Sequence, residues 1–159
     1  MTNGLSASDH IRHIISDCAQ TPYALRVLRA HGMCDTALQA IYKSVVVAKL
    51  LYASSAWAGF ITAADRQRVD AFLRRSIRCG FCPSDIPLFE ELLKASDEQL
   101  FSKVIHNKCH LLYKYLPPPS AASQNYHLRP RTHKRQLADH SGHLTDSNFF
   151  THHLYNDVY

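Results

Sequence analysis

Thr62–Arg78, which reads TAADRQRVDAFLRRSIR, contains the clearest helical pattern in the chain. Its large apolar residues recur at the spacing that places side chains on one face of an α-helix: Val69, Phe72, Leu73 and Ile77. Thr62 and Asp65 form a capping box at its start, with Asp in place of the usual Glu or Gln. Gly80 is a suitable residue to end the helix. The segment therefore predicts an amphipathic helix and favours an all-α fold.

The residues before this segment also predict helices. Ser8 or Asp9 is expected to cap the first one. Pro22 either kinks that helix or opens a second one, because proline is tolerated in a first helical turn. Gly32 is the expected stop before a helix capped by Asp35 and continuing to about residue 52. Residues 44–47 also permit a short strand, although the apolar run is long for one.

Two further helices are expected after Gly80, and the chain then changes character. One covers about 86–94, and a capping box of Ser96 and Gln99 opens the other, from 97 to about 115. Pro117, Pro118 and Pro119 interrupt the helical pattern. We therefore expect a small helical bundle over 9–116 and an irregular, basic, His-rich tail over 117–159, with a short helix near 148–155.

Composition limits the class of protein. The chain has 159 residues, 46% of them hydrophobic, which is enough for one domain with a real core. Its net charge of +5 favours polyanionic partners. The apolar run 45–60 is interrupted by Lys49 and is too short for a membrane span. The 5 cysteines, without a signal sequence, indicate reduced thiols. We expect an intracellular protein, in the nucleus or cytoplasm, with no membrane partner.

Two basic clusters are candidate nucleic-acid contacts. The first lies on the polar face of the arginine-rich helix, where guanidinium groups can contact successive phosphates: Arg68, Arg74, Arg75 and Arg78. The second lies in the tail, beside Tyr126, which can stack on a base: Arg129, Arg131, Lys134 and Arg135. The alternatives are an ordinary solvated helix face and a basic tail without a fixed partner.

Catalytic and metal chemistry find little support. Cys79 and Cys82 have C-x-x-C spacing, with His106 and His110 downstream. No second C-x-x-C is present and the gap fits no standard finger, so we expect buried thiols and no metal, with zinc as the alternative. The 13 acidic residues contain no adjacent pair of aspartates for two-metal catalysis. No phosphate-binding glycine loop or nucleophile motif occurs. Neither an active site, a cofactor nor a small-molecule substrate is expected.

Several segments, taken in order, resemble one family. They are Tyr23–Gly32, Ile41–Ser44, Leu51–Phe60, Asp65–Arg68, Arg74–Pro83, Asp97–Phe101, His110, Leu116–Pro118, Tyr126–His133, Asn148–Phe150 and Leu154–Tyr159. Over nearly the whole chain they resemble the C-terminal region of non-LTR (LINE-type, jockey-like) retrotransposon reverse transcriptases. The family usually has proline where this sequence has Ser55, in a YASPAW run.

The resemblance implies a location within the polymerase. Residues of about 8–80 correspond to the thumb, a helical bundle that grips the RNA–DNA template–primer duplex, and residues 1–8 to a remnant of the segment that closes the palm. The family's catalytic aspartates and endonuclease lie upstream of the matching region. The resemblance therefore implies backbone binding without catalysis.

Other functions remain open. One is a protein-interaction or inert relic domain, because a thumb without its palm would expose apolar surface. Another is a helix-turn-helix DNA binder formed by 35–53 and 62–79, although the eight-residue connection between them is longer than usual.

Overall fold

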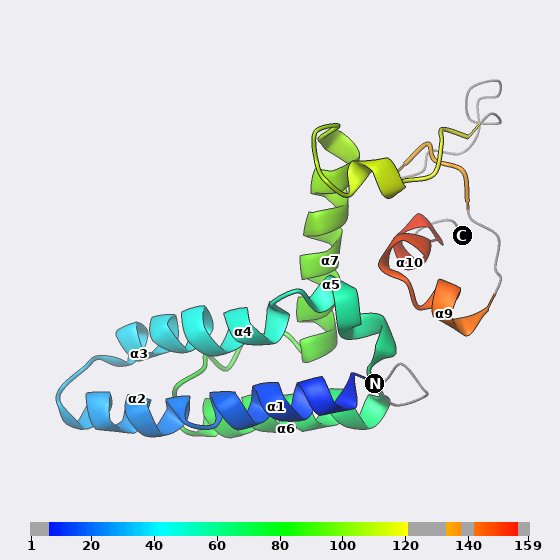
Figure 1. The fold of residues 1–159 in the computed structure, drawn as a ribbon. Coiled ribbons are helices and arrows are strands. Elements are labelled where there is room, and N and C mark those ends of the chain that lie inside the picture. Colours follow the sequence, from blue (N-terminus) through cyan, green and yellow to red (C-terminus); the bar gives the residue numbers. More distant parts are fainter. Residues whose placement is uncertain (1–6, 121–132, 138–141, 156–159) are drawn as a thin grey trace. The chain divides into compact units, whose positions relative to one another are not determined.

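The chain folds into helices joined by turns (Figure 1). The computed structural model describes residues 7–120, 133–137 and 142–155. Its contacts divide the chain into two compact units, Met1–Lys94 and Ala95–Tyr159. Helices dominate both units, and no β-strand occurs within the described ranges. The predicted all-α class is confirmed. The expected palm-closing remnant falls mostly in residues 1–6, which lie outside the described part of the chain.

The first unit contains most of the helices. In chain order they are α1 (Ser8–Cys18), α2 (Thr21–Ala30), α3 (Asp35–Tyr42), the π-helix η1 (Lys43–Val47), α4 (Ala48–Leu51), α5 (Ser54–Trp57), the 3-10 helix η2 (Ala58–Phe60), α6 (Ala63–Arg78) and the start of α7 (Phe89–His106). The helix α1 packs on α6, α2 and α4, and α2 also packs on α3. Pro22 opens a second helix in its first turn, one of the two predicted outcomes.

The segment from Asp35 to Leu51 is helical throughout. The strand reading of 44–47 is wrong, because these residues belong to the π-turn η1 between α3 and α4. Buried Val46 and Val47 project from this turn into the core. The helical path continues through this wider turn, with Val45 exposed on its outer side.

Two glycines end helices as predicted. Gly32 (φ +88°) follows α2, and Gly80 (φ +74°) follows α6. In each case the glycine and the residue after it donate backbone hydrogen bonds to the last helical turn, which is the Schellman pattern. At Gly80 a side chain would also meet Arg29, whose Nη2 lies 3.1 Å from the position of a Cβ. The positive φ therefore favours glycine there, and a Cβ would also displace the Arg29 guanidinium by a few tenths of an ångström.

Two of the expected helix caps are displaced by one residue. Ala7, not Ser8 or Asp9, occupies the N-cap of α1, and the Ser8 hydroxyl instead donates to Asp65 (2.6 Å). Cys34, not Asp35, occupies the N-cap of α3, and Asp35 pairs with Arg29 (3.1 Å). The Ser8 hydroxyl thus bonds a residue 57 positions away, and Asp35 bonds the preceding helix, so neither side chain caps its own helix. The Thr62–Asp65 capping box is confirmed, with both of its hydrogen bonds formed.

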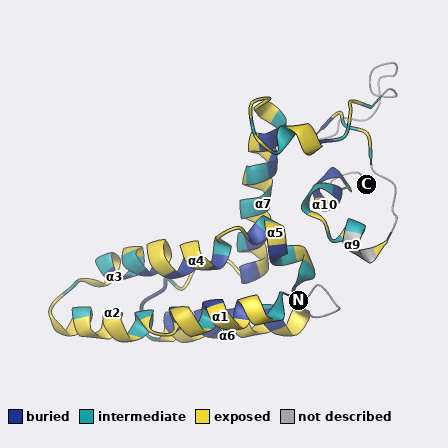
Figure 2. Cartoon of the chain, in the orientation of Figure 1, coloured by how far each residue is buried: buried dark blue, intermediate teal, exposed yellow. Residues whose placement is uncertain are grey.

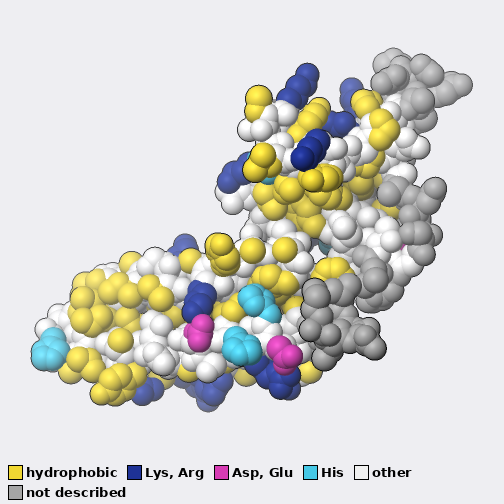
Figure 3. Space-filling model, viewed as in Figure 1, with side chains coloured by type: hydrophobic (Ala, Val, Ile, Leu, Met, Phe, Trp, Pro, Cys, Tyr) yellow, Lys and Arg dark blue, Asp and Glu magenta, His cyan; other side chains and the backbone are white. Residues whose placement is uncertain are grey.

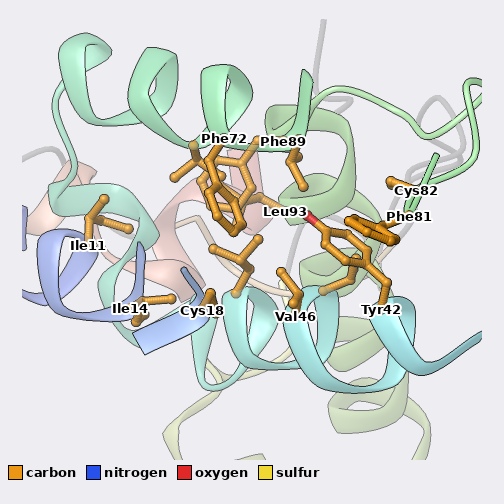
Figure 4. Close-up of a cluster of buried hydrophobic side chains, with 14 of the residues drawn as sticks. Ile11, Ile14, Cys18, Tyr42, Val46, Phe72, Phe81, Cys82, Phe89 and Leu93 are labelled. Carbon is orange, nitrogen blue, oxygen red and sulfur yellow. The ribbon is translucent and has the colours of Figure 1, made fainter. Parts of the chain in front are cut away.

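The core of the first unit lies between the helices (Figures 2 and 4). Buried side chains come from all of its major helices and from the loop after α6: Ile11, Ile14, Cys18, Leu25, Leu38, Tyr42, Val46, Val47, Leu50, Trp57, Ile61, Val69, Phe72, Leu73, Phe81, Cys82, Phe89 and Leu93. The hydroxyl of Tyr42 points into this cluster (Figure 4), and burial raises the pKa of Tyr42 to about 12.

One helix, α7, replaces the two predicted over 86–94 and 97–115. The capping-box pattern of Ser96 and Gln99 was misleading, because neither glycine nor proline separates Phe89 from His106 and both residues are tolerated inside a helix. The helix also ends at His106, well before the predicted 115. The contact boundary between the two units falls inside α7, after Lys94, and the three prolines lie within the second unit.

The second unit has its own small core. Phe101 and Val104 of α7 pack with Leu116 and Leu154. After α7 come the 3-10 helix η3 (Tyr113–Tyr115), α9 (His143–Asp146) and α10 (Phe149–Tyr155). The final helix agrees with the prediction for 148–155. Within the described residues, none of the helices is long and apolar enough to cross a membrane.

Ala53 is the one non-glycine residue with positive φ in the described part of the chain (φ 50°). A left-handed conformation costs an L-residue about 1–2 kcal/mol, so Ala53→Gly is expected to raise the free energy of unfolding by up to about 1 kcal/mol. Urea denaturation measures this change. The matched control is Ala48→Gly, at an exposed helical position, which should lower it by about 1 kcal/mol. A loss of stability in both variants would contradict the assignment of strain to Ala53.

Candidate nucleic-acid interface

The helix α6 presents arginines on its outer face. Its inner side is buried through Asp65, Val69, Phe72, Leu73 and Ser76. The predicted residues all fall on the exposed side: Arg68, Arg74, Arg75 and Arg78. In Figure 3, Lys and Arg side chains gather along the edge of the first unit where Figure 1 shows α6. The amphipathic pattern therefore predicted which side chains of this helix face solvent.

Both acidic residues of α6 are engaged internally. Asp65 is 1% exposed and accepts hydrogen bonds from Ser8, Thr62 and Arg68. Burial alone would raise the pKa of Asp65, but the hydrogen bonds from Ser8 and Thr62 outweigh it and hold the pKa below its usual value. Asp70 accepts a hydrogen bond from the backbone N–H of Phe89 (3.1 Å). Of the four exposed arginines, only Arg68 pairs with one of these carboxylates, that of Asp65.

The four arginines are not equivalent. Arg68 pairs with Asp65 (3.0 Å), although its side chain remains 54% exposed. Arg75 donates from Nε to the carbonyl of Ala71 (3.3 Å), which leaves its terminal nitrogens available. Within the described residues Arg74, Arg75 and Arg78 form no ion pair. We call these three the α6 arginine surface.

Two further arginines approach the end of this helix from α2. Arg29 donates from Nη1 to the carbonyl of Cys79 (2.8 Å), and its guanidinium lies 4.5 Å from the centroid of the Phe81 ring. Nη2 of Arg26 lies 4.0 Å from the sulfur of Cys79. The sequence shows both arginines on an amphipathic helix, but it does not show that they reach α6. Arg29 fixes the chain after α6, and exposed Arg26 adds a cation beside it.

The tail arginines divide differently. Arg129 and Arg131 lie outside the described residues, as does Tyr126. Lys134 is exposed. Arg135 is held by the protein itself: it donates to the Pro117 carbonyl (3.1 Å) and to the Tyr113 hydroxyl (2.8 Å), and it stacks on the Tyr113 ring. Within the second unit, Arg135 therefore joins the tail to η3 and Pro117.

Buried histidines also anchor this tail, which the sequence did not reveal. His133 contacts the Leu154 carbonyl through Nε2 (2.9 Å), and its Nδ1 accepts the N–H of Arg135 (3.1 Å). His153 stacks on Phe101, with ring centroids 5.2 Å apart. The apolar residues near His133 and His153 were the one sequence feature that could have indicated their burial. The basic, His-rich composition of the tail made that feature hard to see.

The four possible zinc ligands are divided between the units. Cys79 and Cys82 belong to the first, and His106 and His110 to the second. No cluster of three or more potential ligands occurs in the part of the chain that the structure describes. Cys82 is buried, and burial raises the pKa of its thiol. His106 and His110 each use Nδ1 in a local hydrogen bond.

Exposed apolar side chains bear on the alternative functions. Tyr23 (70% exposed) and Val27 (41%) lie one turn apart on α2. Val45, Tyr52 and Leu88 are also exposed. The proposed helix-turn-helix pair is joined through α5 and η2, and a short helix in the connection is unlike the tight turn of that motif.

Comparisons with known proteins identify no relative. No protein-family model matches the chain, and no curated protein or solved structure matches it significantly.

Proposed function

We propose that this protein binds the phosphate backbone of a nucleic-acid duplex through the α6 arginine surface, without reading sequence and without catalysis. The observation that carries the proposal is the division of charge on α6. Both of its carboxylates are committed to the fold, whereas Arg74, Arg75 and Arg78 are exposed on its outer face. Guanidinium groups free of carboxylates are available for bidentate contacts with phosphates.

The resemblance to non-LTR reverse transcriptases supports an RNA–DNA hybrid as the duplex. In that family the thumb grips the template–primer, and the arginine-rich helix corresponds to part of the thumb. We propose that the chain derives from such a polymerase and keeps this contact without the palm. Chromosomal DNA or RNA as partner would place the protein inside the cell, in the nucleus or cytoplasm.

A structural role is the main alternative for two of these arginines. Arg75 and Arg78 lie in the last turn of α6, where cations interact favourably with the helix dipole. That role stabilises the helix by about 0.3–1 kcal/mol and requires no ligand. Arg74 is one position earlier, outside the basic residues of the last turn. Binding and stability must therefore be measured separately.

The double substitution Arg74→Gln/Arg78→Gln is expected to weaken binding of an RNA–DNA hybrid about tenfold or more at low salt, because two phosphate contacts are lost. Fluorescence anisotropy of a labelled hybrid measures the affinity. The slope of log K against log salt should become shallower by about 1.8 units, since each contact contributes about 0.9. Thermal unfolding of the same variant measures any loss of stability caused by removing a cation from the last turn of α6.

The matched control is Arg12→Gln/Lys43→Gln, which removes the same net charge from exposed positions on α1 and η1. It should retain most of the affinity, because only long-range attraction is reduced. Equal weakening by both pairs would show that general charge, and not the α6 arginine surface, attracts the hybrid.

A protein-interaction module is the second candidate. The exposed pair Tyr23 and Val27 on α2 supports it, because apolar side chains one turn apart form the usual anchor of a helix–helix contact. Absence of duplex binding by the folded protein would favour this candidate over the first.

A further inference from the structure

A short ridge in the second unit combines cations with exposed large side chains. Residues 107–116 follow α7 as successive tight turns, in which His110 donates its N–H to Asn107, Tyr113 to His110, and Leu116 to Tyr113. Lys108, Leu111 and Lys114 recur at intervals of three residues along these turns, and all are exposed. We call these residues together with Tyr115 the Lys108–Tyr115 ridge.

The ridge is held in place by its inner side. Leu116 is buried, and Leu112 and Tyr113 pack against the core of the second unit. Asn107 accepts the backbone N–H of Cys109 (2.9 Å), which fixes the first turn. The outer side chains are therefore presented by an ordered backbone, so little backbone entropy is lost when a ligand binds them.

Tyr113 and Tyr115 of η3 have different surroundings. The ring and hydroxyl of Tyr113 are both occupied by Arg135. Tyr115 is 62% exposed, and the Nζ of Lys114 lies over its ring, 5.1 Å from the centroid. Leu111, at 84%, is the most exposed of the large hydrophobic residues that the structure describes. The ring of Tyr115 is exposed but has a lysine over one face, so a planar group would stack on the face that Lys114 does not cover.

The charge around the ridge has one sign. Residues 99–138 contain seven Lys and Arg residues and neither Asp nor Glu. Lys108 and Lys114 form no ion pair within the described residues. Figure 3 shows Lys and Arg side chains interspersed with hydrophobic ones on α7 and the turns after it. The surface is therefore complementary to a polyanion that also offers apolar or aromatic faces.

We propose that the Lys108–Tyr115 ridge binds unpaired nucleic acid, with Tyr115 stacking on a base and Lys108 and Lys114 contacting phosphates. Bases in a duplex are stacked on one another, so a lone surface aromatic can use only an unpaired one. A membrane surface fits less well, because two exposed apolar side chains are few for stable insertion. This site is separate from the α6 arginine surface and does not rest on the function proposed for it.

The test is fluorescence anisotropy of a labelled oligothymidylate with the full chain at low salt. Tyr115→Ala is expected to weaken binding about five- to hundredfold, because stacking on one base is lost. Tyr115→Phe keeps the ring and should bind as the parent does. The matched control is Tyr52→Ala, which removes a tyrosine that is 77% exposed in the first unit and should leave the affinity unchanged. An abasic strand should bind the parent and Tyr115→Ala equally.

Three further measurements distinguish binding of a single strand by the ridge from binding of a duplex or of a membrane surface. Oligouridylate should bind about as well as oligothymidylate, because the ridge uses features that RNA and DNA share. Tyr115→Ala should leave the affinity for an RNA–DNA hybrid unchanged. The hybrid therefore tests the duplex-binding proposal, and the single strand tests the ridge proposal, independently of each other. Vesicles rich in anionic lipid should not displace the oligonucleotide.

Three results would overturn the proposal. The first is absence of oligothymidylate binding by the folded parent. The second is that Tyr115→Ala binds oligothymidylate as tightly as the parent does, while Arg74→Gln/Arg78→Gln loses this binding. The third is displacement of the strand by anionic vesicles, which would assign the ridge to a membrane surface.

Discussion

Phe89→Ala is expected to lower the free energy of unfolding by about 3–5 kcal/mol, the usual cost of removing a large aromatic side chain from a core. Phe89 is 0% exposed, and its ring stacks on Trp57 with centroids 6.4 Å apart. Its backbone N–H is also bonded to Asp70 of α6. Phe89 thus joins the start of α7 to α5 and α6, and alanine would leave a cavity where these elements meet.

Leu88→Ala is the matched control for this substitution. Leu88 is the adjacent residue and is 61% exposed, so its removal should change stability by no more than about 0.5 kcal/mol. Urea denaturation followed by circular dichroism measures both variants. A similar loss in the two would contradict the packing of Phe89 in the core.

Asp65→Ala is expected to lower the free energy of unfolding by about 1–3 kcal/mol near neutral pH, because it removes a buried acceptor from part-buried hydrogen-bond donors. Asp65 Oδ2 accepts the Thr62 hydroxyl (2.7 Å) and the Ser8 hydroxyl (2.6 Å). It therefore caps α6 and ties the start of α1 to it. The control is Asp9→Ala, an exposed acid in the first turn of α1, with an expected loss below about 1 kcal/mol.

The pH dependence of stability provides a second readout for Asp65. The pKa of Asp65 is lowered in the folded protein, so the unfolded chain binds its proton at higher pH. This residue therefore contributes stability that is present above the ordinary carboxyl pKa and is lost as the pH falls below it, through the folded value. Asp65→Ala should show a smaller loss of stability between about pH 5 and pH 3 than the parent. An unchanged acid limb would contradict this role of Asp65.

The parts of the fold that follow local rules could be predicted from the sequence. The capping box at Thr62, the apolar spacing of α6 and the stops at Gly32 and Gly80 all depend on residues within a few positions of one another. The same spacing predicted which arginines of α6 face solvent. These features are set by backbone geometry and by burial of one helix face, and both are visible in a single segment.

The parts that failed depend on contacts distant in sequence. Ser8 was expected to cap a helix, but its hydroxyl bonds Asp65 in another. Ser96 was expected to begin a helix, but α7 continues through it because nothing nearby stops it. Arg135 was expected to contact nucleic acid, which stays a prediction, but the sequence did not show that its guanidinium bonds Tyr113 and Pro117. A pattern shows what a side chain can do, but the partner it finds depends on the tertiary fold.

The most direct test of the central claim is a titration of a labelled RNA–DNA hybrid with the full chain at several salt concentrations. The three residues of the α6 arginine surface predict that log K falls linearly with log salt, with a slope of about −3. An unlabelled hybrid of unrelated sequence should compete equally well, because phosphate contacts carry no sequence information. Absence of binding at low salt by the folded protein would contradict the account.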